Sequence, residues 1–216
     1  MIRARLINRL PAERVNKVGV SANDLKSLVL TDGLKSDIFA ALDSKDLADI
    51  KIGFFFAEQL LKPGGDKRFD EDLLQTSLRL FEIGTRDVQS HCVTMFALLG
   101  QRMGNYRELM LRALKGDDAQ ARRKALLTCR TFLNPDEIGP LEVFENDDYA
   151  TEVGMGSHLI YELRNLALET IEKMIGRQFK KFEKTEIYKG KNVVFWWDWE
   201  PFHKWKNSIW HKLKLI

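Results

Sequence analysis

The chain has 216 residues, of which 44 % are hydrophobic and 30 % charged, and its formal net charge is +3. This balance is that of a globular protein and excludes a disordered chain, and the length suits one domain or a single elongated array. The small net charge does not by itself favour nucleic acid, a membrane surface or any other charged partner.

The first part of the chain, residues 1–62, is predicted to form N-terminal helices. A Pro-Gly-Gly sequence at 63–65 follows the last of them and is typical of a helix stop. The helices are expected at about 1–20, with an interruption at Pro11, and at 22–30, 34–43 and 46–62.

The middle of the chain, residues 66–176, shows apolar residues at the spacing of amphipathic helices. Glycines fall between these periodic segments, and the connections are short, which is typical of antiparallel helical hairpins lying side by side. Asn134-Pro135-Asp136-Glu137 is a strong helix-start pattern, with a capping residue, an early proline and acidic residues. Helices are expected at about 70–83, 88–103, 106–114, 117–132, from 134 onward, and at 157–175.

Two sequence patterns repeat within this middle segment. Arg-x-x-Ala-Leu occurs at Arg122 and again at Arg164, and Asp87-Val88 is matched by Asp118-Ala119 at the start of second helices. Over about residues 69–176 the chain therefore resembles HEAT-type helical repeats, in which an Asp opens the second helix of a pair and an Arg precedes a small core residue. The alternative is an irregular helical bundle.

The C-terminal segment, residues 177–216, differs in composition from the rest. It holds ten Lys or Arg against four Asp or Glu, ten aromatic residues, and all five tryptophans of the chain. Residues 186–196 are predicted to form a small β-hairpin, and a final helix is expected to begin near Pro201. Two interpretations remain open: a cap that covers the end of the array, or a binding surface on which aromatic and basic groups contact nucleic acid or protein. The residues concerned are Trp196, Trp197, Trp199, Lys204, Trp205 and Lys206.

An acidic stretch precedes this segment, because no Lys or Arg occurs between Arg130 and Arg164. Acidic surfaces attract basic partners and raise their association rates, so the stretch is a candidate docking surface. The alternative is a solvated loop without a partner. The candidate residues are Glu142, Glu145, Asp147, Asp148 and Glu152.

No catalytic, metal or cofactor motif emerges from the chain. His91 and Cys92 are neighbours on one helix and point apart, while Gly154-Met155-Gly156 lacks the strand and third glycine of a dinucleotide loop. Cys92 and Cys129 are expected to be small buried hydrophobes. The N-terminus lacks the pattern of a signal peptide and the longest apolar run is too short to span a bilayer, so a cytoplasmic location is expected.

Together these observations predict an all-α protein of antiparallel helical hairpins, stacked as a short HEAT-like α-solenoid, with a small C-terminal β-hairpin and a capping helix. We expect no enzyme and no cofactor. The predicted function is macromolecule binding, with an immunity or inhibitor protein that occludes a partner toxin as the favoured role. A nucleic-acid-binding module and an adaptor in a larger assembly are the alternatives, and a membrane partner is not expected.

Overall fold

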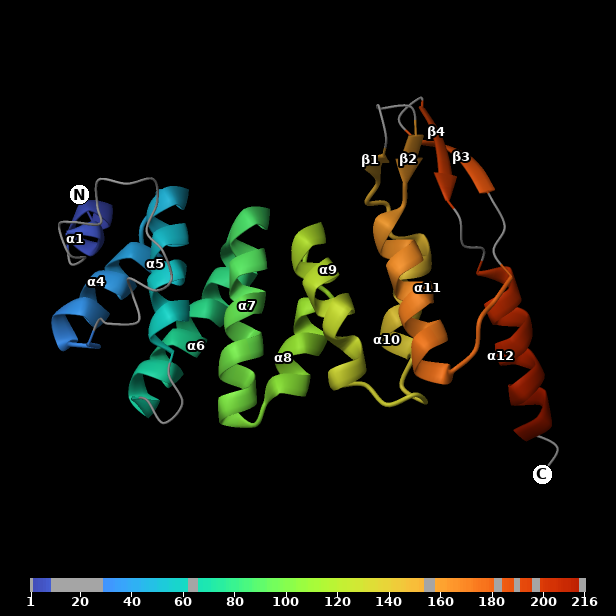
Figure 1. Cartoon of the computed structure of the whole chain (residues 1–216), viewed down its shortest axis with the longest axis horizontal. Helices are drawn as coiled ribbons and strands as arrows, with labels where there is room; N and C mark the ends of the chain where they lie inside the picture. The colour runs from blue at the N-terminus through green and yellow to red at the C-terminus, as the bar shows by residue number, and fades with distance from the viewer. Residues whose placement is uncertain are drawn as a thin grey trace. The chain divides into compact units, whose positions relative to one another are not determined.

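The computed structural model describes residues 2–8, 29–61, 66–153, 158–180, 184–188, 191–195 and 199–213 (Figure 1). These residues are mainly helical, and the helices pack in pairs. The chain divides into two compact units, residues 1–121 (unit 1) and residues 122–216 (unit 2), and each contains its own buried apolar residues. None of the helices in the described ranges is both long enough and apolar enough to cross a membrane.

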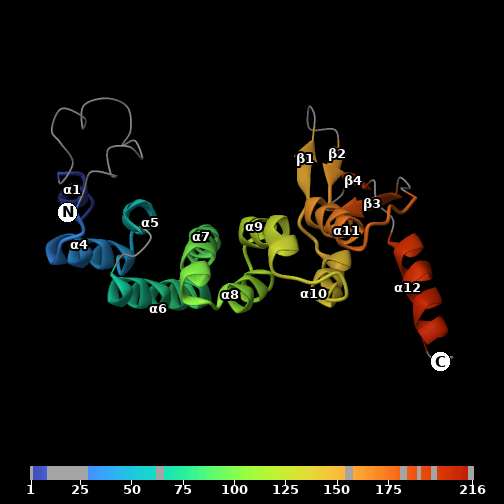
Figure 2. The same cartoon turned by 60° about the horizontal axis from the view of Figure 1, so that its bottom comes forward.

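The described part of unit 1 is helical throughout. The first helices of its pairs, α4, α6 and α8, lie in one row, and the second helices, α5 and α7, lie in another (Figure 2). The helices expected at 34–43, 46–62, 88–103 and 106–114 are confirmed, with small shifts at their ends. The helices are α1 (Ile2–Ile7), α4 (Asp32–Leu42), α5 (Leu47–Leu60), α6 (Lys67–Ile83), α7 (Arg86–Met103), α8 (Tyr106–Ala113) and the first residues of α9 (Ala119–Thr128).

Local hydrogen bonds explain where helices of unit 1 begin and end. Thr31 Oγ1 accepts the backbone N–H of Leu34 at 3.2 Å, and Asp46 Oδ1 accepts that of Ala48 at 2.8 Å. Each bond satisfies a donor that the first turn of a helix leaves without a partner. Helix α7 ends at Gly104, whose φ of 79° lies in the left-handed region that glycine adopts without strain.

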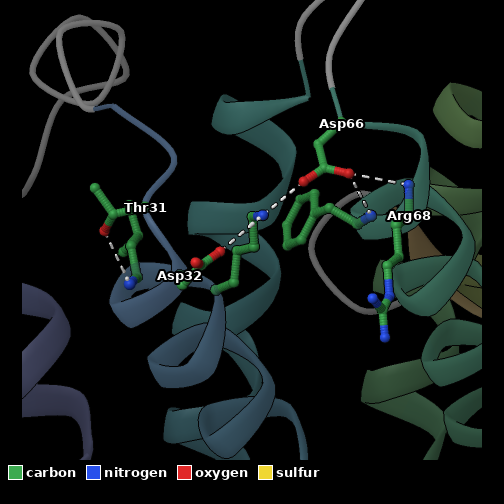
Figure 3. Close-up of polar contacts among 7 residues, drawn as sticks. Thr31, Asp32, Asp66 and Arg68 are labelled. Carbon is green, nitrogen blue, oxygen red and sulfur yellow. Dashed lines mark hydrogen bonds and ion pairs between the residues drawn. The ribbon is translucent and has the colours of Figure 1, made fainter.

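Ion pairs join the first helices of neighbouring pairs. Lys35 of α4 contacts Asp66, which caps the start of α6, at 2.5 Å, and Asp43, which follows the end of α4, pairs with Arg79 of α6. Figure 3 shows Asp66 also accepting backbone N–H groups at the start of α6, beside Arg68. The hydrogen bond between the two side chains raises the pKa of Lys35 and lowers that of Asp66. The start of α6 is thus fixed both by its own cap and by the preceding pair.

The same pattern continues along unit 1. Lys51 of α5 pairs with Asp87 of α7 at 3.4 Å, and Glu82 of α6 pairs with Arg112 of α8 at 2.8 Å. The Lys51–Asp87 and Asp43–Arg79 pairs both join residues 36 apart in sequence, and Glu82–Arg112 joins residues 30 apart. Second helix therefore contacts second helix, and first helix contacts first helix, at similar sequence intervals.

A buried glutamine ties three helices of unit 1 together. Gln89 of α7 donates from Nε2 to the carbonyl of Phe81 in α6 at 2.9 Å, and its Oε1 accepts the backbone N–H of Asp118 at 2.8 Å. Asp118 in turn accepts the N–H of Ala121 in the first turn of α9. Buried polar groups in folded proteins nearly always have hydrogen-bond partners. The Gln89 side chain supplies such partners to a carbonyl near the end of α6 and to an N–H just before the start of α9.

Large aromatic and aliphatic side chains form the core of unit 1. Phe81 of α6 packs on Phe96 of α7 with ring centroids 5.2 Å apart, and Phe54 and Phe56 of α5 are fully or almost fully buried. Burying each such side chain contributes about 1.5–3 kcal/mol, so packing between pairs supplies most of the stability of these helices.

Unit 2 combines helices with a small sheet. Its helix α11 packs against α10, η1 and η2, and buries Leu163, Ala167 and Ile171 completely. The elements are the rest of α9, η1 (Cys129–Thr131), α10 (Gly139–Glu142), η2 (Val143–Asn146), β1 (Thr151–Val153), β2 (His158–Ile160), α11 (Glu162–Ile175), β3 (Lys184–Tyr188), β4 (Lys191–Phe195) and α12 (Glu200–Leu213).

The strands form a sheet in the order β1-β2-β4-β3. β3 pairs with β4 antiparallel, with Glu186 opposite Val193, and β2 pairs with the other edge of β4 in parallel. β1 completes the sheet by antiparallel pairing with β2. The sequence predicts strands only within residues 186–196, so β1 and β2 are additional elements.

The helix predicted to start at Asn134 is wrong. In the structure Asn134 and Glu137 form a turn in which the Glu137 carboxylate accepts both the backbone N–H and the side-chain amide of Asn134. A helix from 134 would carry Pro140 in its interior, where proline lacks the N–H donor and clashes with the preceding turn. The short helix α10 instead begins at Gly139, with Pro140 in its first turn.

The start of the long helix at Ser157 is also wrong. Helix α11 begins at Glu162, and residues 158–160 form strand β2, in which Leu159 lies opposite Glu152 of β1 and Val193 of β4. Pairing with two strands satisfies the backbone groups of this segment as a helix would, so sheet formation overrides the helical spacing of its apolar residues. The predicted helix at 22–30, apart from its last two residues, and the stop at 63–65 lie outside the described residues.

Candidate functional site

The acidic stretch and the C-terminal helix meet in unit 2. Lys206 of α12 lies 2.5 Å and 2.6 Å from the two carboxylate oxygens of Glu142, at the end of α10. His203, one turn earlier in α12, lies 2.8 Å from Glu145 Oε2 in η2. We call these four residues the C-terminal contact. Residues predicted as an acidic and a basic surface thus contact each other inside one unit.

Asp147, the next acidic residue, joins three segments of unit 2. Its Oδ2 lies 3.0 Å from Arg122 of α9, and its Oδ1 accepts the backbone N–H of Tyr149. Its backbone carbonyl accepts a hydrogen bond from Arg164 Nε of α11 at 2.6 Å. The two arginines of the repeated Arg-x-x-Ala-Leu pattern therefore converge on one residue. The guanidinium of Arg164 also stacks over the ring of Tyr161.

The remaining acidic candidates are Asp148 and Glu152. Asp148 is exposed to solvent. Glu152 lies in β1, opposite Leu159, and its side chain lies outside the described part of the structure. The structure therefore gathers Glu142, Glu145 and Asp147 with basic residues of the same unit and does not bring Asp148 to them.

Aromatic residues pack beside the C-terminal contact. Trp199 is 4 % exposed and Phe202 is fully buried, while Trp205 is half-buried. Phe179, in the segment after α11, contacts the rings of both Phe202 and Trp205. These ring contacts hold α12 against the segment that follows α11.

The other C-terminal candidates differ in accessibility. Lys204 projects on the exposed side of α12 and pairs with Glu200 of the same helix at 2.8 Å. Trp196 and Trp197 lie outside the described residues. Of the predicted basic aromatic surface, the described side chains that remain accessible are Lys204 and, in part, Trp205 and Lys206.

The nucleophilic and imidazole side chains that the sequence singled out are engaged in packing. Burial raises the pKa of both Cys92 and Cys129 to about 12, so each is a neutral thiol at physiological pH. His91 stacks on Phe54 with ring centroids 5.8 Å apart. Among the described residues, no three His, Cys, Asp or Glu side chains gather as metal ligands would.

A groove in unit 1 was not predicted from the sequence. It lies where the turn between α4 and α5 meets the turn between α6 and α7, and its volume is about 360 Å³. We call it the turn groove. The residues with apolar side chains that line it are Leu42, Leu47, Ile50, Leu80, Ile83 and Val88.

Burial differs sharply among the residues of the turn groove. Leu42, Leu80 and Val88 are buried and belong to the core, whereas Ile83, the last residue of α6, is 70 % exposed. The sequence marks Ile83 only as the last residue before Gly84. Its exposure depends on how two turns from different pairs come together, and periodicity within one helix carries no such information.

Compared with known proteins, the sequence matches no protein-family model and no curated protein.

Proposed function

We propose that this chain is a non-enzymatic binding protein built of HEAT-like helical pairs, and that its partner is another protein. The observation that carries the proposal is the series of ion pairs between like helices of neighbouring pairs in unit 1, at the intervals of 30 to 36 residues described above. Such regular contacts are what a stacked repeat needs, because one pair cannot bury its apolar face alone.

The repeated Arg-x-x-Ala-Leu pattern supports the same interpretation in unit 2. Ala125 and Ala167, the small residues of the two Arg-x-x-Ala-Leu copies, are both fully buried, and the arginines of both copies contact Asp147. The step from repeat architecture to binding is an analogy with other stacked helical arrays, whose extended surfaces commonly bind macromolecules.

A protein partner is favoured over nucleic acid by the contacts of α12. Lys206 is paired with Glu142, and Trp199 is almost fully buried, so two of the residues that would contact phosphates and bases are used within unit 2. Nucleic-acid binding by stacking needs accessible rings next to unpaired cations.

Within this class we propose the role of an inhibitor or immunity protein, acting in the cytoplasm, that occludes a partner toxin. Such a protein forms a stable complex in which the partner loses its activity. An adaptor would instead form part of a larger assembly whose members remain active.

Affinity capture of the tagged full chain from its native cell lysate, with and without nuclease, tests this proposal. We expect one protein partner in near-equal amount that resists nuclease treatment, and we expect its activity to fall when the purified chain is added back. Recovery of nucleic acid, or of proteins that nuclease removes, would contradict the proposal and favour the C-terminal basic surface.

A binding titration at several salt concentrations provides an independent check. Nucleic-acid binding weakens steeply with salt because each neutralised phosphate releases counterions. A shallow dependence, with a complex that persists in about 0.5 M salt, agrees with a partly apolar protein interface.

A further inference from the structure

The turn groove combines an apolar floor with an accessible apolar wall. Single exposed hydrophobic residues are normal on protein surfaces and need no function. Ile83 differs because it stands beside a floor of core residues from two helical pairs, in a hollow of about 360 Å³. That volume is within the range of natural ligand sites and accommodates one or two large apolar side chains.

The charges around the turn groove are not balanced. Asp43 and Arg79 line the groove and neutralise each other, and Asp87 nearby is paired with Lys51. Lys45, which also lines the groove, is exposed.

Arg86 follows the groove residue Thr85 at the start of α7 and is exposed as well. Within the described part of the chain, neither Lys45 nor Arg86 forms an ion pair. Asp46, beside Lys45, is occupied as the cap of α5 and accepts the N–H of Ala48. Among the described residues, Lys45 in the groove and Arg86 next to the groove residue Thr85 therefore have no carboxylate partner, and a ligand with carboxylates would complement them.

From this geometry we propose that the turn groove binds a short segment of a protein partner in which one or two large apolar side chains are flanked by carboxylates. The apolar side chains lie against Ile83 and the buried floor, and the carboxylates contact Lys45 and Arg86. This inference rests on the proposed function, because it names the partner chemistry for one surface of the binding protein.

Two synthetic peptides test the chemistry directly. One carries Leu and Phe between glutamates, and the other has the same sequence with lysines in place of the glutamates. Each is titrated into the isotopically labelled full chain while backbone amide shifts are followed by NMR. We expect the acidic peptide to shift the amides of residues 42–50 and 79–88, and the basic peptide to bind at least about tenfold more weakly. Equal binding of both peptides, or shifts elsewhere only, would overturn the inference.

Matched variants test the residues. Ile83→Asp places a charge on the apolar wall and should weaken binding of the acidic peptide by about tenfold or more. Lys45→Glu, as a separate variant, reverses the charge of a groove residue and should also weaken binding of the acidic peptide, most strongly at low salt. Val29→Asp is the control, since Val29 is 76 % exposed and does not line the groove. Because these side chains are exposed, the variants are expected to fold, which circular dichroism verifies. Equal loss in the Ile83 and Val29 variants would contradict the groove.

Capture experiments separate the failure of this inference from that of the proposed function. If the wild-type chain retains a protein partner and Ile83→Asp retains it equally, the groove inference is wrong while the binding function stands. If the wild-type chain retains no protein partner, the binding function itself is wrong. Loss of the partner from Ile83→Asp alone supports both.

Discussion

At the scale of single residues, Asp147 has more contacts among the described residues than Glu142, Glu145 or Asp148. Its side chain is 10 % exposed and that of Arg122 is 15 % exposed, so their ion pair is screened little by solvent. Asp147→Ala removes one buried partner of the Arg122 guanidinium and the acceptor for Tyr149 N–H. We expect a loss of about 2 kcal/mol in the free energy of unfolding, measured by denaturant titration.

The neighbouring residue provides the control for Asp147. Asp148 is exposed, and Asp148→Ala should change the free energy of unfolding by less than about 0.5 kcal/mol. If Asp147→Ala is equally mild, its contacts contribute nothing to the fold and the residue remains a candidate for partner binding.

The two cysteines allow a chemical prediction about burial. Both are buried and their thiol pKa is about 12, so the reactive thiolate is almost absent at pH 8. We expect no thiol to react with Ellman's reagent in the native chain and two thiols to react after unfolding in guanidinium. Rapid reaction of one native thiol would show that its helix opens locally and would contradict its interpretation as a buried hydrophobic residue.

Sequence reasoning succeeded for residues whose role follows from their own helix. Ala125 and Ala167, the small core residues expected after the two arginines of the Arg-x-x-Ala-Leu pattern, are fully buried. It did not predict the partner of Arg122, because Asp147 follows a segment of turns and short helices whose path no periodicity specifies. Side-chain type and helix face are local properties, whereas the identity of a contact depends on the whole path of the chain.

At the scale of elements, α12 gives the clearest test of the C-terminal contact. Lys206→Glu places two carboxylates together and should loosen α12, whereas Glu142→Lys combined with Lys206→Glu restores an opposite-charge pair. A double-mutant cycle should give a coupling energy of about 1 kcal/mol, with tryptophan fluorescence as the readout. Additive effects of the two substitutions would mean that the pair does not hold α12.

Elements were predictable where one residue pattern acts alone, and were missed where two patterns compete. The capped helices of unit 1 follow from apolar spacing together with residues such as Asp46 and Asp66. At Asn134 the start pattern competes with Pro140, which stops a helix six residues later, and the proline determines the outcome. The β1 and β2 strands are three residues each, too short for alternation to be recognised in sequence.

At the scale of the whole molecule, the uneven distribution of charge has a structural use within unit 2. Residues 122–176 hold six Lys or Arg against ten Asp or Glu, and residues 177–216 hold ten against four. The Lys206–Glu142 contact joins residues 64 apart, and the His203–Glu145 contact joins residues 58 apart. Opposite charges far apart in sequence can indicate either two binding surfaces or one internal contact, and composition alone cannot distinguish them.

The division into two units predicts how the molecule unfolds. All five tryptophans lie in residues 196–210, so tryptophan fluorescence reports on unit 2, whereas far-ultraviolet circular dichroism reports on the helices of both units. Gln89→Leu removes two buried hydrogen bonds from unit 1, and should lower the stability of that unit by about 2 kcal/mol, or its Tm by roughly 10 °C.

If each unit folds around its own core, Gln89→Leu should shift part of the circular dichroism transition and leave the fluorescence transition unchanged. Asp147→Ala perturbs unit 2, so it should shift the fluorescence transition together with the part of the circular dichroism transition that comes from the helices of unit 2. The comparison needs both variants, because a variant that shifts both probes could act through helix α9, which begins in unit 1 and ends in unit 2. Equal shifts of both probes in both variants would mean that the chain unfolds as one cooperative structure, because damage to one core would then destabilise the other.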